Sequence, residues 1–255
     1  MGYSTLNFQH DGHGIATITL NVPEKRNAIS SQMVSELLEA FRQAEKEPAR
    51  VVVLTGQGKA FCAGMDLSEL QELARETQEK NIEDARRLSK MLYRLYSFPK
   101  PVIAAVNGHA IAGGCMLATL ADFTLAVPEA KFGYPEVKLG FIPAIVTTML
   151  RRAVNERLAM ELALTGEPVA APRAHAIGLI NGVFPDAEFE ASVERYVAVM
   201  SEQSATAMSL SKRVLYQTDG MSFEESIEAG VQANVEARAT EDFKRGVARF
   251  LKKSK

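Results

Sequence analysis

Short apolar runs constrain the fold of this chain more than any other feature. Residues 51–55 and 102–106 are almost wholly apolar, are too short for helices, and are bounded by Gly or Pro. Residues 123–127 form a similar run, and residues 15–20 alternate β-branched side chains as strands do. Before the run at 51–55, residues 30–46 place their apolar side chains on one helical face. This succession of strands and helices predicts an α/β fold.

The remaining chain is predicted to be mainly helical. Residues 68–97 form a charged helical block that ends before two prolines, and amphipathic helices dominate beyond Val146. The sequence contains no low-complexity linker and no repeat of fixed period. We therefore expect one catalytic unit, with a core over residues 1–195 and a helical C-terminal region over residues 196–255.

The composition argues against several classes of function. The 255 residues are 47% hydrophobic and 24% charged, which suits a well-packed domain, and the net charge of −2 provides no general attraction to nucleic acid or membranes. No apolar run reaches the roughly 18 residues of a membrane helix, and the first residues lack a secretory signal pattern. Cys62 and Cys115 are the only cysteines, so we expect neither a disulfide framework nor a metal site, and a reducing cytoplasm.

Small residues follow the strand predicted at 102–106. In the segment 107–115, Ala112, Gly113 and Gly114 would let a ligand or another backbone approach the main chain closely. If a helix begins here, its first N–H groups lack partners and carry the positive end of the helix dipole, which suits an anionic oxygen. A close contact between a helix and a strand would explain the same small residues.

A second bend of small residues follows the strand predicted at 51–55. Within residues 59–66, Ala63 and Gly64 expose their backbone, and Asp66 is positioned to cap the next helix. Two such bends after two parallel strands could each donate one N–H to the same oxygen and so form an oxyanion hole. Losing one donor of such a pair typically costs ~3 kcal/mol of transition-state stabilisation.

A carboxyl group lies in a third segment, residues 132–140. Glu136 occupies a short turn between a strand and the apolar residues 141–143. In apolar surroundings its pKa would rise, so that it could exchange protons near neutrality. An isolated glutamate of this kind could equally be a solvated surface group.

Other polar features have simpler explanations. We expect a structural role for His109 and a packing role for Cys62 and Cys115, since neither thiol has a recognisable base partner. Residues 55–58 resemble the start of a dinucleotide-binding loop, but Phe61 stands where that loop needs a glycine.

Taken together, these segments resemble the enoyl-CoA hydratase/isomerase (crotonase) family. The signature-like part is Ile103-Ala-Ala-Val-Asn-Gly108, then Ala112-Gly-Gly114, then Ala121-Asp122-Phe123. Further landmarks of the family appear in the same order along nearly the whole chain: Pro23 to Ala28, Val53 to Gly56, Ala60 to Asp66, Pro99 to Pro101, Phe132 to Glu136, Leu164 to Gly166 and Ala176 to Leu179.

The resemblance implies a spiral of strand–strand–helix units with a helical C-terminal region that forms trimers or hexamers. It implies an acyl-CoA substrate, with coenzyme A as part of the substrate and no separate cofactor. The N–H groups of Ala63 and Gly113 would hold the thioester oxygen while an enolate forms, and Glu136 would be the acid/base. The residues expected to contact substrate or CoA are Lys25, Arg26, Ala28, Ala63, Gly64, Met65, Asp66, Leu67, Gly113, Met116, Tyr134, Phe141 and, from a neighbouring subunit, Lys253.

One position departs from the family pattern. Typical hydratases of the family carry a second glutamate after the Gly-Gly-Cys turn, where this chain has Met116, which cannot accept a proton. A Δ3,Δ2-enoyl-CoA isomerase needs only one glutamate, yet residues 140–146 resemble a branch composed mainly of hydratases. We favour a hydratase that uses Glu136 alone; an isomerase and a non-catalytic CoA-binding scaffold remain alternatives.

Overall fold

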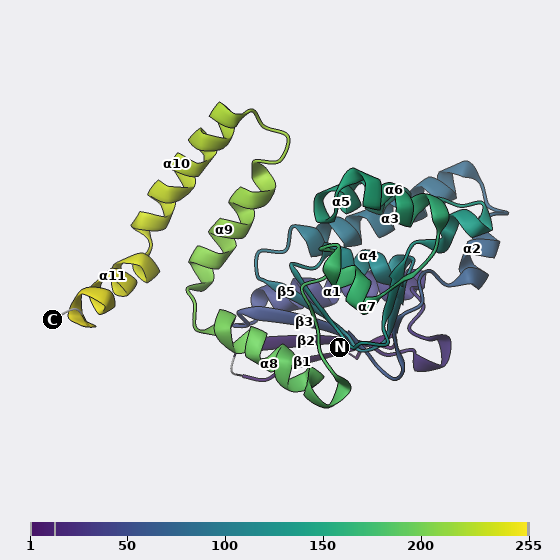
Figure 1. The fold of residues 1–255 in the computed structure, drawn as a ribbon, viewed down its shortest axis with the longest axis horizontal. Helices are drawn as coiled ribbons and strands as arrows, with labels where there is room; N and C mark the ends of the chain where they lie inside the picture. Colours follow the sequence, from purple (N-terminus) through teal and green to yellow (C-terminus); the bar gives the residue numbers. More distant parts are fainter. Residues whose placement is uncertain (1, 13, 254–255) are drawn as a thin grey trace.

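The computed structural model describes residues 2–12 and 14–253. Figure 1 shows a mixed α/β body from which the last three helices project as an arm. The described strands are β1 (Leu6–His10), β2 (Ile15–Leu20), β3 (Val51–Gly56), β4 (Ala60–Cys62), β5 (Val102–Val106), β6 (His109–Ile111), β7 (Phe123–Ala126), β8 (Lys131–Gly133), β9 (Val169–Ala170) and β10 (Gly182–Val183).

Helices surround the strands. The described helices are the 3-10 helices η1 (Pro23–Lys25) and η2 (Pro135–Leu139) and the α-helices α1 (Ser31–Lys46), α2 (Leu67–Leu73), α3 (Gln78–Tyr96), α4 (Gly113–Leu120), α5 (Ala144–Ala153), α6 (Glu156–Thr165), α7 (Ala171–Ala176), α8 (Asp186–Ser201), α9 (Ala205–Gln217), α10 (Phe223–Ala239) and α11 (Glu241–Lys253). The α1 helix begins as predicted, because the Ser30 side chain accepts a hydrogen bond from the N–H of Met33.

Two sheets organise the body. A six-stranded sheet has the order β1-β2-β3-β5-β7-β10, and a four-stranded sheet has the order β4-β6-β8-β9. Pairing is antiparallel only between β1 and β2 and between β8 and β9. Successive stretches contribute one strand to each sheet and then helix: β3–β4–α2, β5–β6–α4 and β7–β8–η2. This succession confirms the predicted spiral of strand–strand–helix units.

The large sheet is buried on both faces. Val52 and Leu54 of β3 enter the main core, whereas Val51 and Val53 enter a second cluster against α8. Parallel strands covered on both faces have nearly continuous apolar sequences, which is why these runs were recognisable. Because α8 packs on this sheet, it belongs to the body, and the boundary predicted at 195/196 falls inside it.

The arm consists of α9, α10 and α11 and lies outside the body (Figure 1). No described residue of α10 is buried, and Leu210 is the one buried residue of α9. No helix in the described part of the chain is both long enough and apolar enough to cross a membrane.

Candidate active site

The four-stranded sheet brings together the three segments singled out by their sequence. Its strands β4, β6 and β8 are parallel neighbours, and each has three residues. The C-terminal ends of parallel neighbours lie along the same sheet edge, which is where α/β proteins bind ligands. The bend at 63–66 follows β4, Gly113 follows β6, and Glu136 follows β8.

The two bends of small residues touch each other. A β-carbon built on Gly64 would lie 2.8 Å from Cβ of Ala112 and 3.4 Å from the backbone nitrogen of Gly113. A β-carbon built on Gly113 would lie 3.5 Å from Cα of Gly64. Gly64 also has φ of +101°, a conformation open mainly to glycine. Close packing between the two bends therefore accounts for these small residues, and both Gly64 and Gly113 are buried.

The structure corrects the donor predicted in the first bend. The N–H of Ala63 donates to the carbonyl of Arg26 at 3.0 Å, so it is not free for a ligand. An extended stretch follows this residue. There the N–H of Ile29 donates to the carbonyl of Gly64, and the carbonyl of Ile29 accepts from the N–H of Asp66. Backbone groups of successive residues in an extended chain point to opposite sides, so the N–H of Met65 points away from Ile29. Within the described residues, it has no hydrogen-bond acceptor.

The amide of Gly113 is the second available donor. Gly113 opens α4, and the first N–H groups of a helix have no acceptor inside the helix. Ala112, before it, has φ of +50° and ψ of −119°, which is unusual for a residue with a side chain. Its N–H is held by the carbonyl of Gly133 on β8 at 2.8 Å. Residues kept in such conformations often occupy functional sites.

Glu136 carries a buried carboxyl group with a free oxygen. The residue is 8% exposed, and its Oε2 has no hydrogen-bond partner among the described atoms. Burial raises the pKa of Glu136, because a carboxylate loses hydration there. Glu136 lies three residues beyond Gly133, whose carbonyl positions Ala112. The carboxyl group is therefore in the core of this region and not a solvated surface group.

Met116 supplies an apolar wall beside the second donor. Its side chain is buried, and its Cε would lie 3.5 Å from a β-carbon built on Gly113. The position that carries a glutamate in typical hydratases therefore adjoins the Gly113 backbone, and in this chain it holds a thioether that neither accepts nor donates protons.

Three of the residues predicted to contact substrate or CoA, Lys25, Arg26 and Asp66, are connected at the first bend. Lys25 Nζ lies 2.8 Å from Asp66 Oδ2, and Asp66 also caps α2 by accepting from the N–H of Ser68 at 2.9 Å. The hydrogen bond from Lys25 holds the pKa of Asp66 well below its usual value. Arg26 contacts Ala63 through the backbone bond described above. The Asp66 carboxylate is therefore already engaged within the protein.

Other predicted contact residues differ in their exposure. The predicted contact residues Leu67 and Phe141 are both exposed, and Ala28, between Arg26 and Ile29, is partly buried. Lys253 ends α11, and its side chain lies outside the part of the chain that the structure describes, so its predicted contact with a phosphate stays a prediction.

Tyr134 is a correction. Its side chain is fully buried, and its hydroxyl lies 2.6 Å from Thr119 Oγ1 and donates to the carbonyl of Cys115 at 3.4 Å. It ties β8 to α4 from inside the core and has no surface to offer a ligand. The sequence could not reveal this, because a tyrosine before a Pro-Glu turn is equally compatible with a pocket wall.

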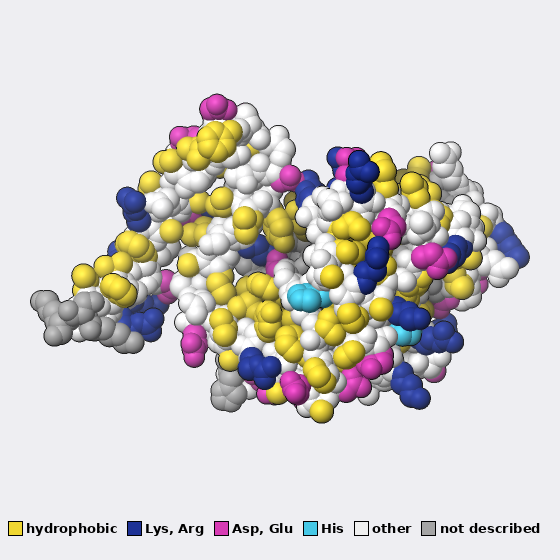
Figure 2. Space-filling view, in the orientation of Figure 1, with side chains coloured by type: hydrophobic (Ala, Val, Ile, Leu, Met, Phe, Trp, Pro, Cys, Tyr) yellow, Lys and Arg dark blue, Asp and Glu magenta, His cyan; other side chains and the backbone are white. Residues whose placement is uncertain are grey.

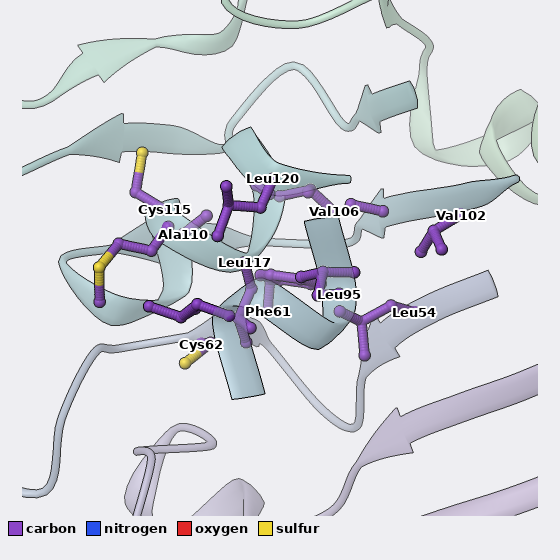
Figure 3. Packing of buried hydrophobic residues seen from close by; sticks show 14 of the residues in the cluster. Leu54, Phe61, Cys62, Leu95, Val102, Val106, Ala110, Cys115, Leu117 and Leu120 are labelled. Atoms are coloured by element: carbon purple, nitrogen blue, oxygen red, sulfur yellow. The ribbon is translucent and has the colours of Figure 1, made fainter. Parts of the chain in front are cut away.

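The two cysteines pack as predicted. Cys62 and Cys115 are buried in the main core with Phe61 and Leu117 (Figure 3). Burial raises the pKa of each thiol to about 12, so both stay protonated at neutral pH. His109 is an exposed residue of β6.

Sequence analysis assigned no role to Asn27 and Ile29. Asn27 is buried with φ of +55°; its Nδ2 donates to the carbonyls of Ala60 and Phe61, and its Oδ1 accepts from the N–H of Val22. This asparagine ties the turn at residues 22–28 to β4. The local signal was an asparagine in a turn, since Asn adopts positive φ more readily than most residues.

A separate cavity of about 680 Å³ lies at the opposite end of α4, between the body and α9. Leu120, Asp122, Arg152 and Tyr216 are among its lining residues, and none of the residues discussed above as donors or acid/base lines it. Among the described residues, the two available amides and the carboxyl group without a partner are instead in the segments that follow β4, β6 and β8. Within the described residues, no cluster of side chains could hold a metal ion.

The arrangement suits one kind of chemistry. Two backbone N–H groups can share an oxygen that gains negative charge, and such fixed donors are effective because they need no reorganisation. A carboxyl group with a raised pKa can move a proton to or from the carbon beside that oxygen. Together they can stabilise an enolate and transfer its proton.

Comparison with known proteins gives a consistent result. A sequence model described as enoyl-CoA hydratase/isomerase matches residues 10–255. A Thermus thermophilus protein, provisionally named enoyl-CoA hydratase, is 40% identical over 95% of this chain and 96% of its own length. The 2,3-dehydroadipyl-CoA hydratase of Escherichia coli is 34% identical over 94% of this chain and 92% of its own length. The crystal structure of a Mycobacterium smegmatis enoyl-CoA hydratase superimposes with a TM-score of 0.93 and 30% identity, covering 98% of this chain and 97% of that chain.

Proposed function

The chain belongs to the enoyl-CoA hydratase/isomerase family, and on this premise we propose that it hydrates a 2-enoyl-CoA thioester with Glu136 as its single acid/base. The observation that carries the proposal is the unpartnered Oε2 of a buried Glu136, on the sheet edge that also bears two available amides. The hydratase names of the relatives favour hydration over other reactions of the family.

In the proposed reaction, the N–H groups of Met65 and Gly113 donate to the thioester oxygen. As carboxylate, Glu136 accepts a proton from a water molecule whose oxygen bonds to C3, and electrons move to the thioester oxygen to give an enolate. Protonated Glu136 then returns that proton to C2, which restores the carboxylate. The hydroxyl group and the proton of water therefore add to the same face of the double bond, and Glu136 alone carries the proton between them.

The other predicted contacts belong to the CoA part of the substrate. Lys25 and Arg26 lie beside the first bend and are exposed, so we propose that they approach the nucleotide phosphates. The backbone from Gly64 to Leu67 would face the pantetheine, and Phe141 and Met116 would border the acyl group. Coenzyme A is thereby part of the substrate, and we propose no separate cofactor.

Isomerisation is the second candidate, and Met116 favours it. A Δ3,Δ2-enoyl-CoA isomerase removes a proton at C2 and returns it at C4 with one base, and an apolar neighbour keeps water from the enolate. A substrate panel separates the two reactions: crotonyl-CoA and 3-methylglutaconyl-CoA lose enoyl-thioester absorbance on hydration, whereas a 3-enoyl-CoA gains it on isomerisation.

The decisive variant is Glu136→Gln. We expect kcat on the active substrate to fall about 10²- to 10⁴-fold, the range typical of a lost acid/base, while CoA-thioester binding is retained. Glu129→Gln is the matched control, because Glu129 is an exposed carboxylate shortly before β8. Unchanged turnover by Glu136→Gln would refute Glu136 as the acid/base. Binding of thioesters without turnover of any panel member would favour the scaffold alternative.

We further propose that copies of this chain associate through the arm, as trimers or as hexamers built from them. The support is a stripe of four apolar residues along α10, which are 47–76% exposed: Phe223, Ile227, Val231 and Val235. Figure 2 shows apolar side chains exposed along the arm. A stripe of this kind normally lies against another protein surface.

We also propose that the protein works in the cytoplasm. The support is that Cys62 and Cys115 are both free and buried, as suits a reducing compartment.

A further inference from the structure

Ile29 contacts the segments that carry both available amides. Its N–H donates to the carbonyl of Gly64 at 2.7 Å, and its carbonyl accepts from the N–H of Asp66 at 2.9 Å. These two bonds hold the residues on either side of Met65 and so fix the direction of the Met65 N–H. The main chain of Ile29 therefore positions the first donor.

The side chain of Ile29 reaches the second donor. Its Cδ1 would lie 2.9 Å from a β-carbon built on Gly113, which places this methyl group against the Gly113 backbone. Ile29 is fully buried, so no solvent separates the methyl group from the start of α4. A single residue thus connects the two amides through its backbone on one side and its side chain on the other.

The turn that precedes Ile29 is held firmly. Asn27 donates to two carbonyls of β4, and Arg26 accepts from Ala63 on the same segment. The first donor is therefore attached to Ile29 by a rigid unit of backbone. The gap to Gly113 then depends on the direct contact between the two bends and on how far the Ile29 side chain extends.

We propose that Ile29 is a positioning residue that sets the separation between the N–H groups of Met65 and Gly113. The inference depends on the proposed function, since it assumes that both groups donate to one thioester oxygen. Each donor must lie about 2.7–3.1 Å from that oxygen, so the gap between the donors limits how well both bonds form. Removing the Cδ1 methyl lets the start of α4 shift toward Ile29 and spoils the alignment.

The test compares Ile29→Val with Ile18→Val. Both variants delete one methyl group from a fully buried isoleucine of the same core, but Ile18 lies in β2. We expect similar losses of thermal stability in both. In Ile29→Val alone, we expect kcat to fall roughly tenfold, less than the ~100-fold that a 1 Å misplacement can cause, with KM changed less than twofold.

A spectroscopic measurement reports on the donors directly. Hydrogen bonds to the carbonyl of cinnamoyl-CoA polarise its conjugated system and shift its absorbance to the red. We expect the bound probe to show the full shift in wild type and in Ile18→Val, and a reduced shift in Ile29→Val. Purely structural damage would lower stability without affecting this shift.

The measurements distinguish the positioning role of Ile29 from the oxyanion hole on which that role depends. If the wild type shows the red shift and Ile29→Val shows the same shift with unchanged kcat, the positioning role of Ile29 is overturned and the oxyanion hole is not. Absence of any shift in the wild type with bound probe would overturn the proposed oxyanion hole, and the positioning role with it.

Discussion

The carboxyl group of Glu136 is buried without a partner for Oε2, and this arrangement opposes folding when the group is charged. Burial raises its pKa above the ordinary 4.5, because the charged carboxylate loses hydration in the native state. Stability from such a group is fully present below the unfolded-state pKa and is lost as the pH rises through the folded-state pKa. A carboxyl group buried in this way therefore lowers stability at neutral pH.

The variant Glu136→Gln should show how much stability the charged, buried carboxyl group removes. Because glutamine stays neutral, we expect the variant to be more stable than wild type at pH 8, and this advantage to shrink as the pH falls and Glu136 becomes protonated. Urea denaturation at several pH values measures the difference. Glu129→Gln, with its exposed carboxyl group, should show no comparable trend. A pH-independent difference for Glu136→Gln would contradict the raised pKa.

At the scale of elements, a buried ion pair attaches the arm to the body. Lys212 Nζ on α9 lies 2.6 Å from Asp122 Oδ2, and the two side chains are 11% and 12% exposed. Asp122 also accepts from the N–H of Val102 at 2.7 Å and from the hydroxyl of Tyr216 at 2.9 Å. The carboxylate thus joins the starts of β5 and β7 to α9. Burial lowers the pKa of Lys212, and the Asp122 charge opposes that shift.

Breaking this pair should destabilise the fold. We expect Lys212→Met to lose about 3–5 kcal/mol, because it leaves Asp122 buried without its cation. The adjacent Arg213 pairs with Glu236 on the surface, so Arg213→Met is a matched control with an expected loss of less than about 1 kcal/mol. Chemical denaturation of both variants measures the contrast. Equal losses would show that burial of the Lys212 pair is unimportant.

A double-mutant cycle tests the coupling between the two charges. It compares the single variants Lys212→Met and Asp122→Asn with the double variant that carries both substitutions. We expect the double variant to lose less than the sum of the two single variants, since neither charge is then left alone. Additive losses would mean that the two charges act independently.

At the scale of the whole molecule, the arm has too few contacts with the body to bury its own apolar surface. Leu215 on α9, the stripe on α10, and Phe250 and Leu251 on α11 are all exposed. Burying apolar surface contributes roughly 25 cal/mol per Å², so a second copy of the chain covering these residues would be strongly favoured. The arm therefore fits an element that completes its packing between subunits.

Ile227→Lys should weaken this association. A lysine in the centre of the stripe would bring an unpaired charge into the contact, and we expect the particle mass measured by light scattering to fall toward that of one chain. Gln232→Lys adds the same charge on a different face of α10 and should leave the mass unchanged. A wild-type protein that is already monomeric would refute the proposed contact.

Much of the architecture could be predicted because its signals are local. The runs at 15–20, 51–55 and 102–106 are strands since their residues suit burial between two layers, and α1 lies within the predicted range 30–46. The strands β4, β6 and β8 were missed. Three residues carry almost no periodicity, and such strands exist only because they pair with distant parts of the chain.

Some parts of the candidate site were also predictable from the sequence, and others were not. The family resemblance indicated roles for Glu136 and Gly113, and the structure brings their segments to one sheet edge. The donor in the first bend was assigned to Ala63, yet the amide without an acceptor among the described residues belongs to Met65. Alternate amides of an extended segment point in opposite directions, and only the pairing with Ile29 decides which one is free.

The amino-acid sequence by itself determined the α/β class, because strand and helix patterns are local. Its resemblance to one family along nearly the whole chain indicated the family and made Glu136 the acid/base candidate. Tertiary structure alone decided that Tyr134 packs inside the core, that Asn27 and Ile29 hold the first bend, and that Gly64 meets Gly113. Each of these depends on contacts between segments far apart in the chain. Such contacts are set by which strands become neighbours, and no local pattern records that choice.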